Sequence, residues 1–330
     1  MNVTLENLML RFPHLSEMLF DHLDNQTLVK CKFVSKELNT YLREQKFHQI
    51  RIIIETVTKF QELRQPWINV FKTAKTRTIM KLGYAVDQFY TKDSAYLNYN
   101  GITPLHVAAG TNNVSLFGTI SEKAKDKEPI DDAGFRPIAF AVENGHIEMT
   151  KAMMKRSEDK NPKAPNSLTL LHKAAIEGQF EIFKMIFEEV QDKNPKDNTG
   201  WTPLHAAATY GNTDICKMII DYLENKNPPD YQGRTPLTLA MLPNHVDVFA
   251  LILKTVENKN PIINLGNTTL HVAAERGYLE ICKLILENVV DLNSQNNAGK
   301  TPLTLASENN HIDVCALIRL HLEKKENIKK

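Results

Sequence analysis

The chain has 330 residues, 42% of them apolar and 24% charged, with a formal net charge of +1. This composition is typical of a soluble globular protein of two or three domains. The near-zero charge excludes a general attraction to nucleic acid or to an anionic membrane. No apolar run approaches the roughly 20 residues that a membrane helix needs. Because Glu6 does not fit a signal peptide and the chain has only four cysteines, we expect a reducing compartment, the cytoplasm or the nucleus.

Residues 8–47 favour three short helices. The first can begin after Phe12–Pro13, and Asp24 can cap the second. Apolar residues recur at helical spacing and form a stripe on each of these two helices. They are Leu15, Met18, Leu19 and Leu23 on the first, then Leu28, Cys31, Val34 and Leu38 on the second. About 40 residues bury too little surface to be stable alone, so this segment needs a partner within the chain or outside it.

This segment resembles the F-box, whose pattern starts with an apolar residue and proline, continues with Leu-Asp and ends near a Val-Ser-Lys sequence. Phe12–Pro13, Leu23–Asp24 and Val34–Ser35–Lys36 match it, whereas Leu38 replaces the usual tryptophan and the first helix is about one residue short. The resemblance implies docking on the adaptor subunit of a cullin-RING ubiquitin ligase. The residues implied in that contact are Phe12, Pro13, Leu15, Leu19, Leu23, Leu28, Val34 and Leu38. The alternative is that residues 8–47 are only a further N-terminal cap.

Residues 48–97 continue the helical pattern without any visible chemistry. Three helices are predicted, over residues 47–63, 66–73 and 76–90, with Pro66 at a first helical position. We expect this section to be a linker that caps the open end of the domain that follows.

Residues 98–322 repeat one pattern every 33 residues. The pattern is clearest in blocks such as TPLH (103–106), and its third residue recurs without any shift in spacing. These anchor residues are Leu105, Ile138, Leu171, Leu204, Leu237, Leu270 and Leu303. Glycines recur four residues before most anchors and seven residues after several, which indicates turns with left-handed backbone. Thr and Pro at the start of each block predict a helix N-terminus, and a second amphipathic helix follows.

This pattern resembles the ankyrin repeat, which has the same period and the same T-P-L-H start. The resemblance implies an all-α solenoid of seven 33-residue units with hairpin fingers along one edge, followed by a polar tail at residues 323–330. The recurring Asn-Pro motif of residues 159–162, 192–195, 225–228 and 258–261 replaces the glycine that the family has after the second helix. The third finger is the least regular, because Ser167 and Leu170 replace its glycine and proline.

Histidines and cysteines are numerous enough to raise the question of catalysis or metal binding. The family uses the histidine of the TPLH block for hydrogen bonds between turns, which accounts for His106, His172, His205 and His271. Cys216, Cys282 and Cys315 occupy one equivalent position in three repeats. They indicate small buried sites, because adjacent helices stack too far apart for a disulfide. No phosphate loop or nucleophile motif is present, so we expect no enzyme, no cofactor and no metal.

Binding in a helical stack uses positions that the fold leaves free. These positions lie in the fingers and after the alanine pair of each first helix, and aromatic and arginine side chains are the usual interface anchors. The candidate protein-binding residues are Tyr99, Phe135, Trp201, Tyr210, Tyr231, Arg234 and Arg276. The alternative for some of these aromatic residues is that they only pack within the finger layer.

The two resemblances together imply a substrate-recognition subunit of a cullin-RING ubiquitin ligase. The F-box-like segment would dock on the ligase adaptor, the repeats would hold a protein substrate, and the chain would be a monomer outside that complex. The second hypothesis is an ankyrin interaction scaffold or inhibitor without a ligase link. An enzyme or nucleic-acid binder is the third, which would need convergent titratable groups or a continuous basic stripe.

Overall fold

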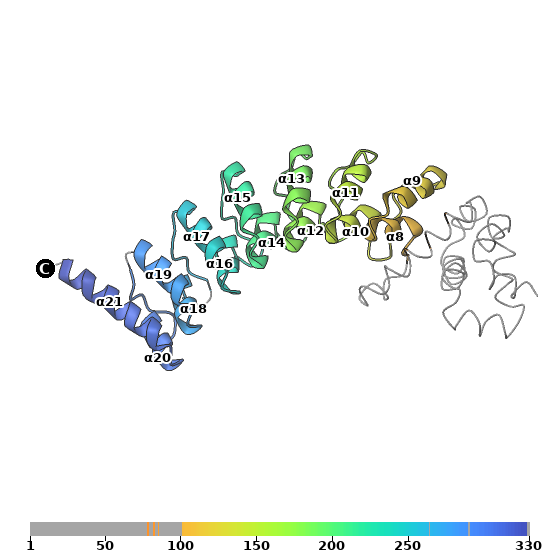
Figure 1. Cartoon of the computed structure of the whole chain (residues 1–330). Helices are drawn as coiled ribbons and strands as arrows, with labels where there is room; N and C mark the ends of the chain where they lie inside the picture. Colours follow the sequence, from red (N-terminus) through yellow and green to blue (C-terminus); the bar gives the residue numbers. More distant parts are fainter. Residues whose placement is uncertain are drawn as a thin grey trace, which may run out of the picture. The chain divides into compact units, whose positions relative to one another are not determined.

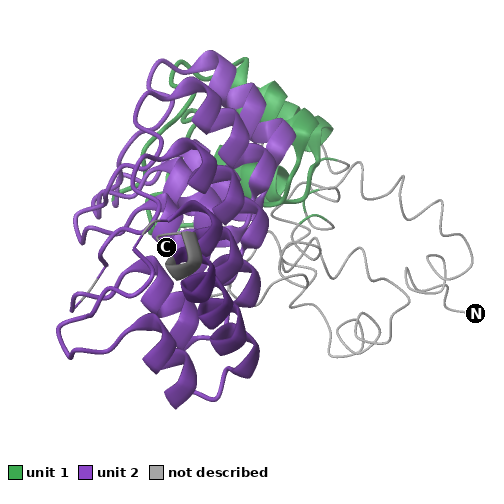
Figure 2. Cartoon of the chain, turned by 90° about the vertical axis from the view of Figure 1, so that its left-hand side faces the viewer, with its two compact units in different colours: residues 1–165 green, residues 166–330 purple. Residues whose placement is uncertain are grey.

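A computed structural model describes residues 78, 82, 85, 101–263, 265–289 and 291–328. The F-box-like segment at 8–47 lies outside these residues, as does nearly all of the linker at 48–97. The chain divides into two compact units, Met1–Pro165 and Asn166–Lys330, which Figure 2 colours separately. Within the described part of the chain, every regular element is a helix, and the single β-bridge joins Ile262 to Thr268.

The described part of unit 1 contains two helix pairs. The helices are α8 (Pro104–Gly110), α9 (Val114–Lys123), α10 (Pro137–Glu143) and α11 (Ile147–Met154). The first helices α8 and α10 pack on each other, and the second helices α9 and α11 do the same. The small, fully buried residues Ala108, Ala109 and Ala141 lie on the first helices, where they allow close approach of the backbones.

Unit 2 contains five helix pairs. The first helices are α12 (Leu170–Glu177), α14 (Pro203–Tyr210), α16 (Pro236–Met241), α18 (Thr269–Glu275) and α20 (Pro302–Glu308). The second helices are α13 (Phe180–Glu189), α15 (Thr213–Tyr222), α17 (Val246–Thr255), α19 (Leu279–Asn288) and α21 (Ile312–Ile328). Consecutive first helices contact each other, and so do consecutive second helices, so that two helix layers run side by side through the unit (Figure 1).

Each first helix begins where the sequence predicts, and the TPLH block explains why. Thr202 has extended backbone (φ −117°) as the N-cap of α14, and Pro203 follows at the first helical position. The helix ends at Gly211, whose φ of 77° is left-handed. A Cβ at Gly211 would lie 2.7 Å from Nδ1 of His245 in the next repeat, so glycine is required both by conformation and by space.

The second helices bury one stripe of apolar residues against the first helices. In α15 the stripe consists of Ile215, Cys216, Ile219 and Ile220, all of which are buried. Among the described cysteines, Cys216, Cys282 and Cys315 are free thiols, and the first two are fully buried. Burial raises the pKa of both Cys216 and Cys282 to about 12, so these thiols are packing groups without nucleophilic character.

The Asn-Pro motif stands in place of the glycine after the second helix, and its side chains make hydrogen bonds to the neighbouring helix ends. The Nζ atoms of Lys193 and Lys259 donate to backbone carbonyls at the ends of α13 and α17, where they cap the helix termini. The side-chain oxygen of Asn227 accepts a hydrogen bond of 2.9 Å from the Leu237 N–H at the start of α16. The motif therefore joins the end of one repeat to the first helix of the next.

Two local details differ from the sequence expectations. Ser167 takes the glycine position of the third finger in a left-handed conformation (φ 63°), and Thr169 still caps α12, so this finger keeps its turn. Helix α21 continues to Ile328, so residues 323–328 of the expected polar tail are helical. No helix of the described residues is long and apolar enough to cross a membrane.

Candidate protein-binding surface

The fingers of unit 2 are tight turns held by aspartate side chains. Oδ1 of Asp197 accepts hydrogen bonds from the backbone N–H groups of Thr199 and Trp201, at 2.8 and 2.9 Å. Asp230 does the same one repeat later for Gln232 and Arg234, both at 2.8 Å. These Asx-type contacts add to the backbone hydrogen bonds of the same fingers, in which the N–H of Asp197 donates to Trp201 O and that of Asp230 to Arg234 O, both at 2.8 Å.

Trp201 and Arg234 meet on the second oxygen of Asp230. The indole Nε1–H of Trp201 donates to Asp230 Oδ2 at 3.0 Å, and Arg234 Nε donates to the same atom at 2.7 Å. The Arg234 guanidinium lies 5.4 Å from the Trp201 ring centroid, within cation–π range. Burial alone would raise the pKa of Asp230, but the hydrogen bonds from Arg234 and from backbone N–H groups outweigh it and lower that pKa.

Tyr231 extends this cluster into solvent. Its backbone N–H donates to Thr199 O at 3.1 Å, which joins the two fingers, and its ring lies against Gly200. The ring is 70% exposed, and Lys196 Nζ lies 5.8 Å from its centroid. Trp201 and Arg234 are half-buried. Together Trp201, Asp230, Tyr231, Arg234 and Lys196 form the finger cluster, which presents aromatic rings beside cations.

The buried histidines are structural in every repeat where they occur. Nδ1 of His205 accepts hydrogen bonds from the N–H of Thr202, so its Nε2 carries the proton and donates to Arg234 O in the next finger at 3.3 Å. Desolvation lowers the pKa of His205 to about 4, and it also lowers the pKa of His172 and His271. These rings are neutral at pH 7, and both nitrogens of each ring take part in hydrogen bonds within and between repeats.

The other predicted binding residues fall in several places. Tyr210 is 53% exposed at the end of α14, and Arg276 is exposed immediately after α18. In unit 1, Phe135 is half-buried, with its N–H bonded to Asp131 and its carbonyl to His106. Tyr99 and the eight F-box positions lie outside the described residues. The structure thus brings together Trp201, Tyr231 and Arg234.

The sixth finger carries two exposed apolar side chains that are not among the predicted binding residues. Leu265 is 77% exposed and left-handed (φ 52°), a strained conformation for a leucine, and Gly266 follows with φ 76°. Ile262 is 72% exposed on the same finger. Its signal was the apolar sequence PIINLG, where other fingers have polar residues such as KDNTG.

Metal chemistry finds no support in the described part of the chain, because no group of three His, Cys, Asp or Glu residues there could hold an ion. The absence of a cofactor and of catalytic activity stays a prediction. What the finger cluster offers chemically is recognition, through aromatic surface, cation–π contacts and hydrogen-bond donors.

Comparisons with known proteins agree with the geometry of these repeats. The family model for ankyrin repeats (three copies) matches residues 171–264 and 256–329. Among the many solved structures that match is the crystal structure of the human ASB11 ankyrin repeat domain, at 20% sequence identity and a TM-score of 0.58. The match covers 67% of this chain and 98% of that one, and at this identity it shows the fold alone. No curated protein matches the chain. The chain therefore contains ankyrin repeats.

Proposed function

We propose that the chain binds a protein partner through the finger cluster of unit 2, as one element of a solenoid of seven ankyrin repeats. The observation that carries this proposal is the pre-ordered arrangement of Trp201, Tyr231 and Arg234 around Asp230. Anchors that are already held in one conformation lose little entropy on binding, and Trp, Tyr and Arg are the residues that most often dominate interface energies. Tyr210 at the end of α14 adds a further exposed ring in unit 2.

The finer proposal is that this partner is a substrate of a cullin-RING ubiquitin ligase. It is supported by the F-box resemblance of residues 8–47, with Leu23, Leu28 and Val34 as the residues that would contact the ligase adaptor. The chain itself would then carry out no bond chemistry. It would raise the effective concentration of a substrate lysine near the charged ubiquitin-conjugating enzyme. An interaction scaffold without a ligase link is the alternative.

Partner binding can be tested with a pair of matched tyrosine variants. Tyr231→Ser removes an exposed ring from the finger cluster, and Tyr222→Ser removes a ring of similar exposure (58%) from the end of α15 in the other helix layer. Proteins captured from cells by the wild-type chain should be lost with Tyr231→Ser and retained with Tyr222→Ser. Retention of all of them by a folded Tyr231→Ser variant, made also in combination with Trp201→Ala, would contradict the proposal.

A further inference from the structure

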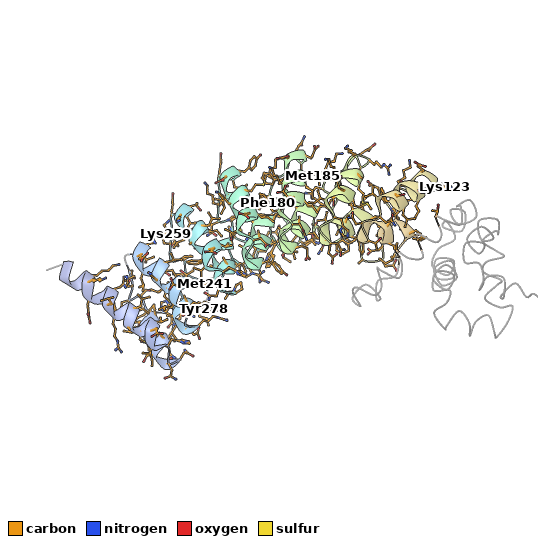
Figure 3. The ribbon with its side chains drawn as sticks, in the orientation of Figure 1. Lys123, Phe180, Met185, Met241, Lys259 and Tyr278 are labelled. Carbon is orange, nitrogen blue, oxygen red and sulfur yellow. The ribbon has the colours of Figure 1, made fainter. Side chains whose placement is uncertain are left out.

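Unit 1 contains a cavity of about 340 Å³ at which α9, α10 and α11 meet. Its walls include the buried apolar side chains of Phe117, Ile138 and Met153. Its polar lining consists of Ser121, Glu122, Lys127, Glu128, Arg136, Arg156 and Ser157. A volume of this size falls at the lower end of the range for ligand pockets, and apolar walls with a few charged groups are typical of them. Ser121 and Glu122 of the lining belong to the C-terminal end of α9, whose last residue, Lys123, is labelled in Figure 3.

The lining of the cavity includes three positions at which the first two repeats depart from the 33-residue pattern. Ser121 stands where the second to sixth repeats have a large apolar residue, which is Met154, Phe187, Ile220, Leu253 or Leu286, and where the seventh has Arg319. Glu128 replaces the asparagine of the Asn-Pro motif, and Arg136 replaces the threonine that caps the first helix. Three substitutions scattered along the sequence therefore converge on one site in space.

The lysine of the motif folds back onto the preceding helix in some repeats and not in others. Lys160, Lys193 and Lys259 each fold back so that Nζ donates to a carbonyl at the end of the preceding helix. Lys127 occupies the equivalent position in the first repeat and, like Lys226 in the fourth, makes no such bond. Lys127 is exposed and has no hydrogen bond or ion pair within the part of the chain that the structure describes. Its charge is therefore available at the rim of the cavity.

The two arginines of the cavity have different partners. Arg136 forms an ion pair of 2.5 Å with Glu128, which neutralises it. Arg156 donates from Nη1 to the hydroxyl of Ser121 at 2.9 Å and lies 5.7 Å from the Phe117 ring centroid. Among the described residues it has no carboxylate partner. The remaining N–H groups of its planar fork suit a carboxylate, which can accept two parallel hydrogen bonds.

We propose that this cavity binds an acidic side chain of a protein partner together with the apolar residue next to it. The carboxylate would pair with Arg156 and Lys127, and the apolar side chain would fill the space between Phe117, Ile138 and Met153. A singly charged carboxylate matches the lining better than a phosphate dianion does. With Arg136 paired to Glu128, the remaining charges of Lys127, Arg156 and Glu122 leave one net positive charge, which a carboxylate balances. The inference extends the protein-binding function proposed above to a second site, in unit 1, that does not involve the finger cluster.

The test uses the full-length chain and a displayed library of random heptapeptides as the probe. Ser121→Leu fills the cavity with the residue type of the later repeats, and Arg156→Glu reverses the charge that should hold the ligand. Lys155→Glu is the matched control, since it reverses an exposed charge one residue away that does not line the cavity. Melting temperatures of all three variants establish that each is folded.

We expect selected peptides to share an aspartate or glutamate beside an apolar residue. Their affinity should fall at least about tenfold with Ser121→Leu, with Arg156→Glu, or on changing the peptide's acidic residue to its amide, and stay unchanged with Lys155→Glu. The proposal is overturned if no selected peptide depends on Ser121 and Arg156, or if those that do lack an acidic residue. Tyr231→Ser should leave these peptides bound, so failure here is distinguishable from failure of the finger cluster.

Discussion

The indole N–H of Trp201 donates a hydrogen bond of 3.0 Å to Asp230, which lies 29 positions further along the chain in the next finger. Asp230 in turn orients the Arg234 guanidinium, which lies over the Trp201 ring. The N–H of Trp201 therefore joins two fingers, in addition to the binding role that we propose for its ring. Variants of Trp201 therefore have to separate binding from stability.

Trp201→Phe keeps an aromatic ring and removes the hydrogen bond to Asp230. We expect a loss of about 1 kcal/mol in the free energy of unfolding, with most of the partner affinity retained. Trp201→Ala removes the ring as well, so it should lower both the stability and the affinity. Denaturant unfolding and a binding titration on the same preparations separate these effects. Equal affinity of the wild type and the alanine variant would restrict Trp201 to a structural role.

Asp131 and Asp230 occupy equivalent positions in two fingers, and we expect opposite effects when each is changed to asparagine. Both oxygens of Asp230 accept hydrogen bonds, whereas the Oδ2 atom of Asp131 is buried without a partner among the described residues. Desolvation raises the pKa of Asp131 despite its backbone hydrogen bonds. Asp131→Asn should therefore stabilise the chain by about 1 kcal/mol or less, and Asp230→Asn should destabilise it. Melting temperatures of the two variants check the signs.

The raised pKa of Asp131 also predicts how the stabilisation produced by Asp131→Asn depends on pH. Because its folded-state pKa lies above the unfolded value of 3.8, the penalty of the buried charge is present at neutral pH and is relieved as the pH falls through the folded-state pKa. The stabilisation produced by Asp131→Asn should therefore shrink in acid. A gain that stays constant between neutral and acidic pH would show that charge burial is not its cause.

The buried histidines predict that stability decreases in mild acid. His205 has a folded-state pKa of about 4, well below the usual 6.5, so the unfolded chain binds protons more readily over this window. Its contribution is complete above pH 6.5 and is lost as the pH falls toward 4, at up to about 1.4 kcal/mol per pH unit. His205→Thr introduces the residue found at Thr238, and it should flatten this slope in urea unfolding series. An unchanged slope would contradict the assignment of a neutral ring.

Gly211 and Gly118 form a second matched pair. Gly211→Ala places a Cβ at a left-handed φ of 77° and only 2.7 Å from His245 Nδ1, so it should cost more than about 1 kcal/mol. Gly118 lies inside α9 with no atom within 4 Å of an added Cβ. Gly118→Ala should stabilise by about 0.5–1 kcal/mol, because alanine is the better helix former. Thermal unfolding measures both, and equal effects would refute the distinction.

Residues that recur at fixed spacing predicted the helix pairs. Contacts between the fingers of neighbouring repeats were predicted less completely. The Thr-Pro starts, the left-handed glycines and the hydrogen bonds of His205 follow from residues that recur at fixed spacing, and each is confirmed. The pairing of Trp201 with Asp230 could not be predicted, because it depends on how closely two fingers approach. That distance is set by packing of the whole repeat, which no single motif encodes.

The cavity of unit 1 could not be predicted from the sequence alone either. Its signal was present as departures from the period at Ser121, Glu128 and Arg136, each of which is unremarkable alone. Only the fold shows that the three positions face one space and that Arg156 from the next repeat enters it. In a repeat protein, comparison of each position with its equivalents is therefore a way to find sites that motifs do not identify.

The most direct test of the proposed ligase function is complex formation between the purified chain and the adaptor subunit of a cullin-RING ligase. Light scattering after size exclusion should show a stable one-to-one complex with the wild type. Leu23→Asp and Val34→Asp should each abolish it while leaving the helical signal of the repeats unchanged, because both changes place a charge on the apolar stripe of the F-box-like segment. A folded wild-type chain that forms no complex with the adaptor would contradict the ligase account and leave an ankyrin interaction scaffold in its place.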